Sequence, residues 1–288
     1  MSNEPALSVV LGAYNRKPFL KATMESLRRE IDGLAAEMIV VDGGSTDGSL
    51  RWLARQKDIL TIVQHNRGLW RGRPIARRSW GYFMNLAFKC AQGKYILMVS
   101  DDCLLVPGAV RAGLQLFEER LAKGDRLGAV AFYWRNWPEQ KEYWVGLTFE
   151  RMFVNHGLFL RSALSHIGWI DEDSFFFYHA DSDLALRLWD AGYQVIDCPG
   201  AFVEHFTHAT VAVRETNLER QQKDWGAYLA RWRQVYKTEA DGRWLTRAYD
   251  DPERTYRRFP RLQVGRSRLN QEIARLAGFL ARVRSRLA

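Results

Sequence analysis

Residues 38–45 read MIVVDGGS, a short apolar run that ends in an acid, two glycines and a serine. The same order returns at residues 7–15 (LSVVLGAYN) and 95–102 (YILMVSDD). An apolar run without alternating polar residues is typical of a strand that is buried on both faces, as parallel strands are. Residues 18–29 and 81–91 have helical spacing of apolar residues. The alternation predicts an α/β fold with a doubly wound, mostly parallel sheet flanked by helices.

Polar side chains stand where three of these runs end. Tyr14 and Asn15 follow the first run, Asp42 the second, and Asp101 and Asp102 the third. In doubly wound sheets, ligands bind beyond the carboxyl ends of the strands, and these ends lie at one edge. We therefore expect the five side chains to surround one binding site.

The composition suits a globular protein with an anionic partner. Of 288 residues, 47% are hydrophobic and 26% charged, which excludes a disordered protein. Lys and Arg outnumber Asp and Glu by 42 to 33, a net charge of +9, which favours a phosphate, a nucleic acid or an acidic membrane face. Three scattered cysteines predict neither a disulfide framework nor a structural zinc site. With no secretory signal and no apolar run near the about 20 residues of a membrane span, a cytoplasmic protein is expected.

Adjacent carboxylates at a strand end need a cation or hydrogen-bond donors beside them. Asp101 and Asp102 repel each other and are costly to desolvate. A hard cation such as Mg²⁺ or Mn²⁺, shared with a substrate diphosphate, would satisfy both. The alternative is an exposed acidic turn before Pro107 and Gly108.

Other positions carry groups with both a functional and a structural interpretation. Asp42 could bind a base or ribose, or only cap the turn and helix that follow. His205 could bind a metal ion, or be an ordinary surface or core histidine. Asp181 and Asp183, just before a helix at 184–191, could supply a general base or cap that helix.

Three clusters are open to two interpretations in the same way. The basic loop 65–78 could face a diphosphate or only solvent. An aromatic cluster could stack on acceptor sugars or form a core patch. The tail 261–288, with seven arginines and one acid, could lie on an anionic membrane or pack on its own domain or a second copy of the chain. The residues are Arg67, Arg71, Arg73, Arg77 and Arg78 in the loop, Trp134, Trp137, Tyr143 and Trp144 in the cluster, and Leu269, Ile273, Leu276, Leu280, Val283 and Leu287 along the tail.

The order of these segments resembles family 2 of the inverting, nucleotide-sugar-dependent glycosyltransferases, which have the GT-A fold. The matching segments are residues 9–16, 39–49, 95–108 and 178–192, with Asn85, Ala91 and Gly93 between them. The resemblance spans residues 7–208. Three positions depart from the family pattern: Ser100 replaces the first acid of the Asp-x-Asp-type motif, Ala180 the acid beside the base, and Gly43 a frequent second acid.

The resemblance implies a role for each matching residue. It places Ala13, Tyr14, Asn15, Asp42 and Asn85 at the nucleotide, and Asp101 near the ribose. It makes Asp102 and His205 ligands of Mn²⁺ or Mg²⁺, and Asp181 the catalytic base. It divides the chain into a catalytic unit at 1–210, with a nucleotide-sugar half (1–105) and an acceptor half (106–210), and a helical, basic extension at 211–288.

The expected function is transfer of a sugar from a UDP-, GDP- or dTDP-sugar to a glycan or lipid-linked acceptor, in bacterial-type surface polysaccharide or lipopolysaccharide synthesis. We expect this in the cytoplasm or on the inner face of its membrane, with a homodimer as an open alternative. A nucleotidyltransferase would need a Gly-rich phosphate loop where residues 12–16 read GAYNR. A non-enzymatic basic adaptor for nucleic acid or membrane leaves the ordered carboxylates unexplained. We therefore expect no nucleic-acid partner.

Overall fold

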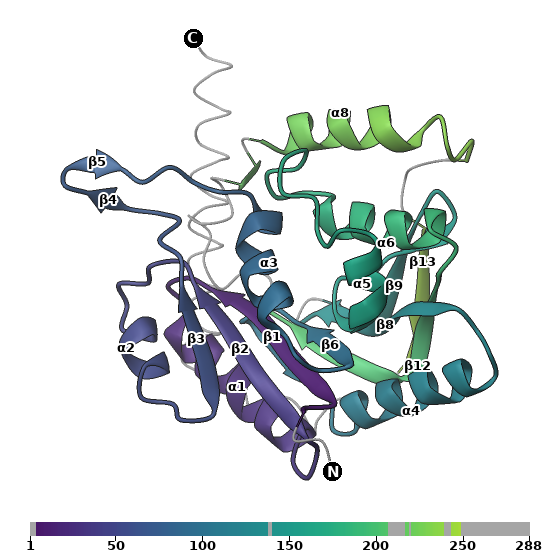
Figure 1. Cartoon of the computed structure of the whole chain (residues 1–288), viewed down its shortest axis with the longest axis horizontal. Coiled ribbons are helices and arrows are strands. Elements are labelled where there is room, and N and C mark those ends of the chain that lie inside the picture. Colours follow the sequence, from purple (N-terminus) through teal and green to yellow (C-terminus); the bar gives the residue numbers. More distant parts are fainter. Residues whose placement is uncertain (1–3, 138–139, 207–216, 219, 239–242, 249–288) are drawn as a thin grey trace.

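The computed structural model describes residues 4–137, 140–206, 217–218, 220–238 and 243–248 (Figure 1). Strands and helices alternate through the first hundred residues, as predicted. These elements are β1 (Leu7–Ala13), α1 (Lys17–Glu30), β2 (Ala36–Asp42), α2 (Ser49–Leu53), β3 (Ile59–Val63), β4 (Leu69–Trp70), β5 (Arg73–Pro74), α3 (Trp80–Cys90) and β6 (Tyr95–Met98). The elements that follow are β7 (Cys103–Leu105), α4 (Ala109–Ala122), β8 (Leu127–Asn136), β9 (Tyr143–Thr148), β10 (Arg151–Met152), β11 (Gly157–Leu160), α5 (Arg161–His166), α6 (Ala180–Asp190), β12 (Gln194–His205), α8 (Gln221–Trp232) and β13 (Arg243–Arg247).

One curled sheet organises the molecule, in the order β10-β9-β8-β11-β6-β1-β2-β3. The strands β6, β1, β2 and β3 run parallel, with Val10 of β1 opposite Ile39 of β2 and Met98 of β6. This half is the doubly wound sheet that the apolar runs predict. The rest of the sheet is mixed, because β11 pairs antiparallel with both β6 and β8 while β12 runs parallel to β8.

Each face of the sheet is covered by its own helices. Val9 and Leu11 pack with Leu20 of α1 and Phe117 of α4, whereas Val10 between them packs on the opposite side, with α3 and α6. All are buried, and each large apolar side chain taken out of water stabilises the fold by about 1.5–3 kcal/mol. Burial on both faces explains why these strands show no alternation of polar residues.

The long strand β12 ends beside β7, which directly follows the adjacent carboxylates. The pattern predicts a strand only at residues 195–198, but β12 continues to His205 after an irregularity between Cys198 and Phe202. Its last residues pair antiparallel with β7, so that His205 lies opposite Cys103. The end of β12 therefore lies next to the carboxylates that follow β6.

Two other expectations about local structure need correction. The spacing of Leu50, Trp52 and Leu53 predicts a helix at 46–55, but the structure has only the short α2 there. Asp47 accepts hydrogen bonds from the Ser49 and Lys17 backbone N–H groups and holds a turn instead. The extension after residue 217 is not wholly helical, since β13 pairs with β9. The tail 261–288 lies outside the described residues, and its role stays a prediction.

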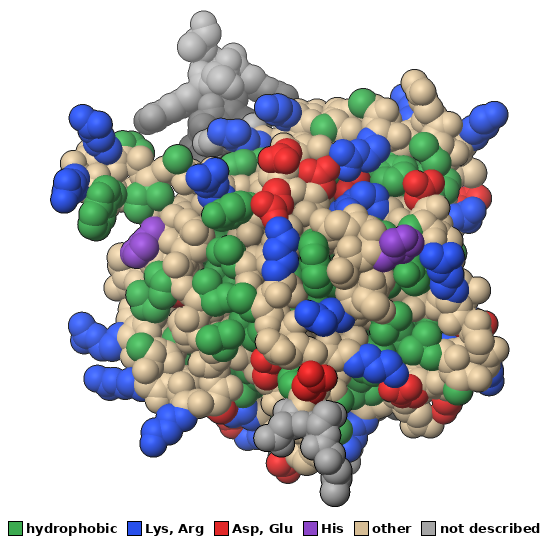
Figure 2. All heavy atoms as spheres, viewed as in Figure 1, with side chains coloured by type: hydrophobic (Ala, Val, Ile, Leu, Met, Phe, Trp, Pro, Cys, Tyr) green, Lys and Arg blue, Asp and Glu red, His purple; other side chains and the backbone are tan. Residues whose placement is uncertain are grey.

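The hairpin of β4 and β5 projects from the body of the molecule (Figure 1). Leu69 and Trp70 on it are 68% and 69% exposed. Figure 2 shows hydrophobic and basic side chains together on this projection. None of the described helices is long and apolar enough to cross a membrane.

Candidate active site

A pocket of about 950 Å³, counting its open mouth, lies at the carboxyl ends of β1, β2 and β6. Ala13, Tyr14 and Asp101 line it, as the sequence predicts, together with Gly43 and Ser100 from the same strand ends. Aromatic and basic side chains close the other walls. They are Trp80, Phe83, Phe176 and Phe177, with Arg16, Arg67, Arg77 and Arg78.

The basic loop contributes to this pocket and does not only face solvent. Asn217, which is buried, accepts hydrogen bonds from Arg67 at 3.2 Å and Arg77 at 2.7 Å. The guanidinium of Arg67 also lies 5.3 Å from the centre of the Tyr14 ring. These contacts place positive charge on the wall opposite the strand ends, where an anionic ligand is favoured.

Asn15 and Asp42 shape the loops beside the pocket. The Oδ1 atom of Asp42 accepts hydrogen bonds from the backbone of Gly44 and Ser45, as its capping interpretation predicts. Its Oδ2 atom is buried and has no hydrogen-bond partner among the described residues. Asn15 has φ +51° and accepts a hydrogen bond from the Thr46 N–H at 2.8 Å, which ties the loops after β1 and β2 together. Asp42, which is fully buried and does not line the pocket, therefore acts with Asn15 through the shape of the loops beside it.

The structure pairs the two adjacent carboxylates with one arginine. Asp101 and Asp102 are 4% and 1% exposed, which excludes the exposed acidic turn. Arg16 Nη1 donates to Asp101 Oδ1 at 2.9 Å and to Asp102 Oδ2 at 2.7 Å. Sequence reasoning missed Arg16, although the need of paired carboxylates for a positive charge was a signal for it.

The pKa values of the two carboxyl groups are shifted in opposite directions. Burial raises the pKa of Asp101 to about 6, and the charge of Asp102 adds to the rise while Arg16 opposes it. Burial opposes ionisation of Asp102 as well, but the charges of Arg16 and then His205 hold its pKa at about 2. Asp102 is therefore the carboxylate that keeps its charge at every physiological pH.

Asp102 offers the carboxylate oxygen that a hard cation prefers as a ligand. The Phe206 N–H donates to the Asp102 carbonyl at 2.9 Å, which fixes the end of β12 beside it. His205 Nε2 lies 3.4 Å from Asp102 Oδ1, and this oxygen is buried without a hydrogen bond in the described part of the chain. A buried charged oxygen without a donor is costly, and a cation would satisfy it. The residues present therefore fit a divalent cation.

Asp181 is joined to the pocket by one amide. Its Oδ2 accepts from the pocket residue Asn155 at 2.8 Å, and its Oδ1 from the Ser182 N–H at 2.9 Å. The Nε1 of Trp134 donates to Asn155 Oδ1 at 3.1 Å, which fixes the orientation of the amide. Burial raises the pKa of Asp181, which suits a proton acceptor. Asn155 is a second residue that sequence reasoning missed.

Asp183 has a structural role. It is fully buried and accepts hydrogen bonds from Arg187, from Arg231 and from the Nε1 of Trp232, at 2.8–2.9 Å. These partners bind α6 to α8. Two of these partners are arginines and none of the three lines the pocket, whereas Asn155, the partner of Asp181, does, so Asp183 is engaged in a structural ion pair.

Asn85 does not line the pocket. Its amide donates to the Ile170 carbonyl at 2.9 Å and to Glu172 Oε1 at 2.7 Å, and accepts from the Ile170 N–H. The expected nucleotide contact is therefore replaced by a bond between α3 and the segment before α6. The physical reason is that Ile170 and Glu172 engage both the nitrogen and the oxygen of the Asn85 amide.

The aromatic cluster is mostly core. Trp134, Trp137 and Tyr143 are buried, and Trp134 packs on Trp144 with ring centres 3.7 Å apart. Trp144 in turn contacts Trp244, which is 50% exposed. Stacking on an acceptor would have to use this outer end of the cluster.

Comparisons with known proteins agree on one family. The family model described as "Glycosyl transferase family 2" matches residues 8–167, more than half of the chain. The chain is 30% identical over 148 residues to chondroitin synthase of Escherichia coli, covering 46% of this chain and 20% of that protein. It is 29% identical over 132 residues to the uncharacterized glycosyltransferase YfnE of Bacillus subtilis (strain 168), covering 44% and 30%. The chain thus spans less than a third of the length of these relatives.

Solved structures with similar folds are also glycosyltransferases. S. aureus TarS in complex with UDP-GlcNAc has a TM-score of 0.56 at 13% identity, covering 77% of this chain and 66% of that chain. The mannosyltransferase PcManGT from Pyrobaculum calidifontis, in complex with GDP-Man and Mn²⁺, has a TM-score of 0.54 at 18% identity, covering 79% and 65%. At such identities the likeness shows a shared GT-A fold.

Proposed function

Since this chain belongs to glycosyl transferase family 2 and is a glycosyltransferase, we propose that it moves a sugar from a nucleotide-sugar donor to a glycan or lipid-linked acceptor, with inversion and with a divalent cation. One observation carries the proposal. The pocket at the strand ends and the carboxylate of Asp181 share Asn155, which lines the first and hydrogen-bonds the second. A donor site and a proton acceptor therefore meet at one place.

The donor fits the pocket by charge and shape. Ala13, Tyr14 and Asp101 would contact the nucleoside, and Asp42, buried behind them, would hold the loop that follows β2. Arg67, Arg77 and Arg78 on the opposite wall would neutralise the diphosphate, whose negative charge grows as it leaves. GDP-Man and UDP-GlcNAc are bound by the structural neighbours, which favours a donor of this class here.

Asp181 takes the proton. The acceptor hydroxyl oxygen attacks the anomeric carbon while its proton passes to a carboxylate oxygen of Asp181. The bond from the anomeric carbon to the diphosphate breaks, and its electron pair leaves with the phosphate oxygen. Because attack and departure lie on opposite faces of the sugar, the configuration inverts. Asn155 and the Ser182 N–H orient Asp181 for this step.

Asp102, with His205 as the second candidate ligand, would hold Mn²⁺ or Mg²⁺. Such a cation supplies Lewis-acid stabilisation of diphosphate charge. Arg16 balances only one of the two negative charges of the carboxylate pair, and Asp102 keeps one oxygen for the ion. The Mn²⁺ complex of PcManGT favours the same class of ion.

Membrane contact is part of the proposal. We place the enzyme in the cytoplasm, against the anionic inner face of the membrane, in synthesis of surface polysaccharide or lipopolysaccharide. The net charge of +9 and the arginine-rich tail 261–288 support this. The exposed Leu69 and Trp70, with Arg71 and Arg73 in the same hairpin, would add an apolar and basic contact. The same tail could instead bind a second copy of the chain.

A thermal-shift panel tests the donor class. UDP-, GDP- and dTDP-sugars are added with and without Mn²⁺, and nucleic acid is the comparison ligand. A donor at a hundred times its Kd should add about 2.7 kcal/mol, or about 5–10 °C in Tm for a chain of this size. We expect at least one donor to reach this, and to do so better with Mn²⁺. A shift with nucleic acid alone would favour a basic adaptor, and release of pyrophosphate in a turnover assay would favour a nucleotidyltransferase.

A further inference from the structure

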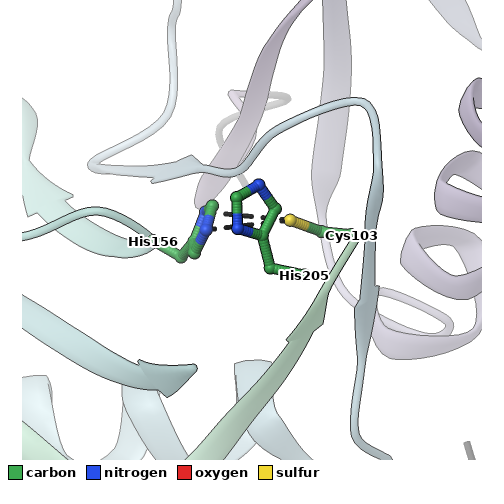
Figure 3. Close-up of side chains that lie close together, drawn as sticks. All are labelled: Cys103, His156 and His205. Atoms are coloured by element: carbon green, nitrogen blue, oxygen red, sulfur yellow. Dashed lines mark hydrogen bonds between the residues drawn. The ribbon is translucent and has the colours of Figure 1, made fainter. Parts of the chain in front are cut away.

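Three metal-ligand side chains meet directly behind Asp102. Cys103 is the first residue of β7, His156 precedes β11, and His205 ends β12 (Figure 3). One ligand atom from each lies within 4.8 Å of the others. Cys103 Sγ is 3.8 Å from His156 Nε2, and the two histidine rings have centres 5.0 Å apart. Segments far apart in the sequence thus converge on one point.

The hydrogen bonding within the cluster is weak, with Cys103 Sγ 3.8–3.9 Å from the two ring nitrogens of His156. Cys103 and His156 are buried, at 0% and 3% exposure, and a thiol is a weak partner for an imidazole. The Nδ1 atom of His205 is buried without a hydrogen-bond partner among the described residues. Trp134 packs edge-on against both histidine rings. Buried polar atoms are normally satisfied, so this arrangement calls for a missing partner.

We propose that Cys103, His156 and His205 form a binding site for a transition-metal ion of the zinc type. Two imidazole nitrogens and a thiolate are ligands that zinc prefers over Mg²⁺ or Mn²⁺. Given bond lengths of about 2.0–2.3 Å, ligand atoms on a tetrahedral zinc lie about 3.3–3.7 Å apart. The sulfur–nitrogen distance of 3.8 Å is close to this, so small side-chain rotations complete the site. Binding releases the Cys103 thiol proton to solvent.

The site would also position the carboxylate of the active site. When Nδ1 of His205 binds the metal, its Nε2 carries the proton and faces Asp102 Oδ1, now 3.4 Å away. A metal-bound histidine characteristically donates its other N–H to a carboxylate. In that state His205 has no nitrogen left for the cation of the donor site, so it acts on that cation through Asp102, as a positioning residue and not as the second ligand. This last step rests on the proposed function, whereas binding of the zinc-type ion does not.

Cobalt binding tests the proposal without any sugar nucleotide. The full-length chain is stripped of metal, reduced, and titrated with Co²⁺ while its absorption is recorded. Thiolate ligation gives a charge-transfer band in the near-ultraviolet, and tetrahedral geometry gives intense visible bands. The double variant Cys90→Ser/Cys198→Ser keeps Cys103 as the single cysteine. It is the control, because the wild-type Cys198 that it replaces is also buried but lies outside the cluster. Cys103→Ser is the matched variant that removes the proposed thiolate ligand.

We expect one equivalent of Co²⁺ with both bands in the wild type and in the double variant, displaced by Zn²⁺ but not by excess Mg²⁺ or Mn²⁺. In Cys103→Ser the charge-transfer band should disappear, and Zn²⁺ affinity should fall by more than the about 10–100-fold that loss of an outer partner costs. Absence of the band in the double variant overturns the proposal even if Cys103→Ser fails to fold. Persistence of the band in folded Cys103→Ser overturns it too. Turnover of the sugar-nucleotide donor is measured separately, so that a failure of the proposed function can be told apart from a failure of the proposed metal site.

Discussion

Replacing Asp181 with Asn should separate catalysis from donor binding. The amide has nearly the shape of the carboxylate but cannot accept the acceptor's proton. General-base catalysis contributes about 10²–10⁴-fold, so kcat should fall by this factor, which corresponds to about 2.7–5.5 kcal/mol in the activation barrier. Asn155 stands between Asp181 and the pocket, and donor affinity should therefore change little.

The same substitution should barely change stability. The Asn155 amide and the Ser182 N–H bond different oxygens of Asp181, and Asn offers only one oxygen, so one hydrogen bond of about 1 kcal/mol is lost. The opposing effect comes from the raised pKa. A carboxyl whose pKa is raised on folding loses stability as pH rises from its unfolded to its folded pKa, so ionised Asp181 destabilises the fold at neutral pH. Asn removes that cost.

The assay measures kcat, donor Kd and Tm of the variant beside the wild type. Wild-type kcat/KM should fall on the acid side at a pH above the ordinary aspartate pKa of about 3.9, because burial raises the pKa of Asp181. The reasoning is refuted if Asp181→Asn retains its turnover. It is equally refuted if donor affinity falls as much as kcat, since Asp181 would then belong to the nucleotide pocket.

Three further predictions concern neighbouring parts of the molecule. Asp183→Asn should lower the free energy of unfolding by about 3 kcal/mol in urea titration, because it breaks a buried ion pair, and any folded fraction should keep its kcat; unchanged stability would contradict its structural role. Asp102→Asn should abolish Mn²⁺-dependent transfer with little change in circular dichroism, and undiminished turnover in Mn²⁺ would remove it from the metal site. Deleting residues 261–288 should weaken binding to anionic vesicles in a salt-dependent way, each arginine contributing about 1 kcal/mol, while turnover on a soluble acceptor is kept. Trp70→Ser is the companion variant, and equal vesicle binding by both variants and the wild type would rule out both contacts.

The gathering of Tyr14, Asp42 and Asp101 could be predicted from the sequence. Each follows an apolar run, and parallel pairing necessarily brings the carboxyl ends of such strands to one edge. The periodicity that identifies the strands is local, as is the position of the polar residues after them. Fold and donor pocket are therefore largely contained in short stretches of the chain.

The other half of the site depends on contacts that no local pattern contains. His205 reaches Asp102 because β12 resumes after its irregularity and pairs with β7, which lies far from it in the chain. Asp181 and Asp183 look equivalent in the sequence, but Arg231 and Trp232 of α8 bind only the second. Arg16 follows a predicted site residue directly, yet only the fold shows that it bridges both carboxylates.

The most direct test of the central claim is the anomeric configuration of the first-formed product, followed by proton NMR during transfer or slow donor hydrolysis with Mn²⁺. An α-linked nucleotide-sugar donor should give the β-configured product in the wild type, formed about 10²–10⁴-fold more slowly by the Asp181→Asn variant. An α-configured product, or equal rates in the two proteins, would contradict an inverting reaction in which Asp181 takes the proton.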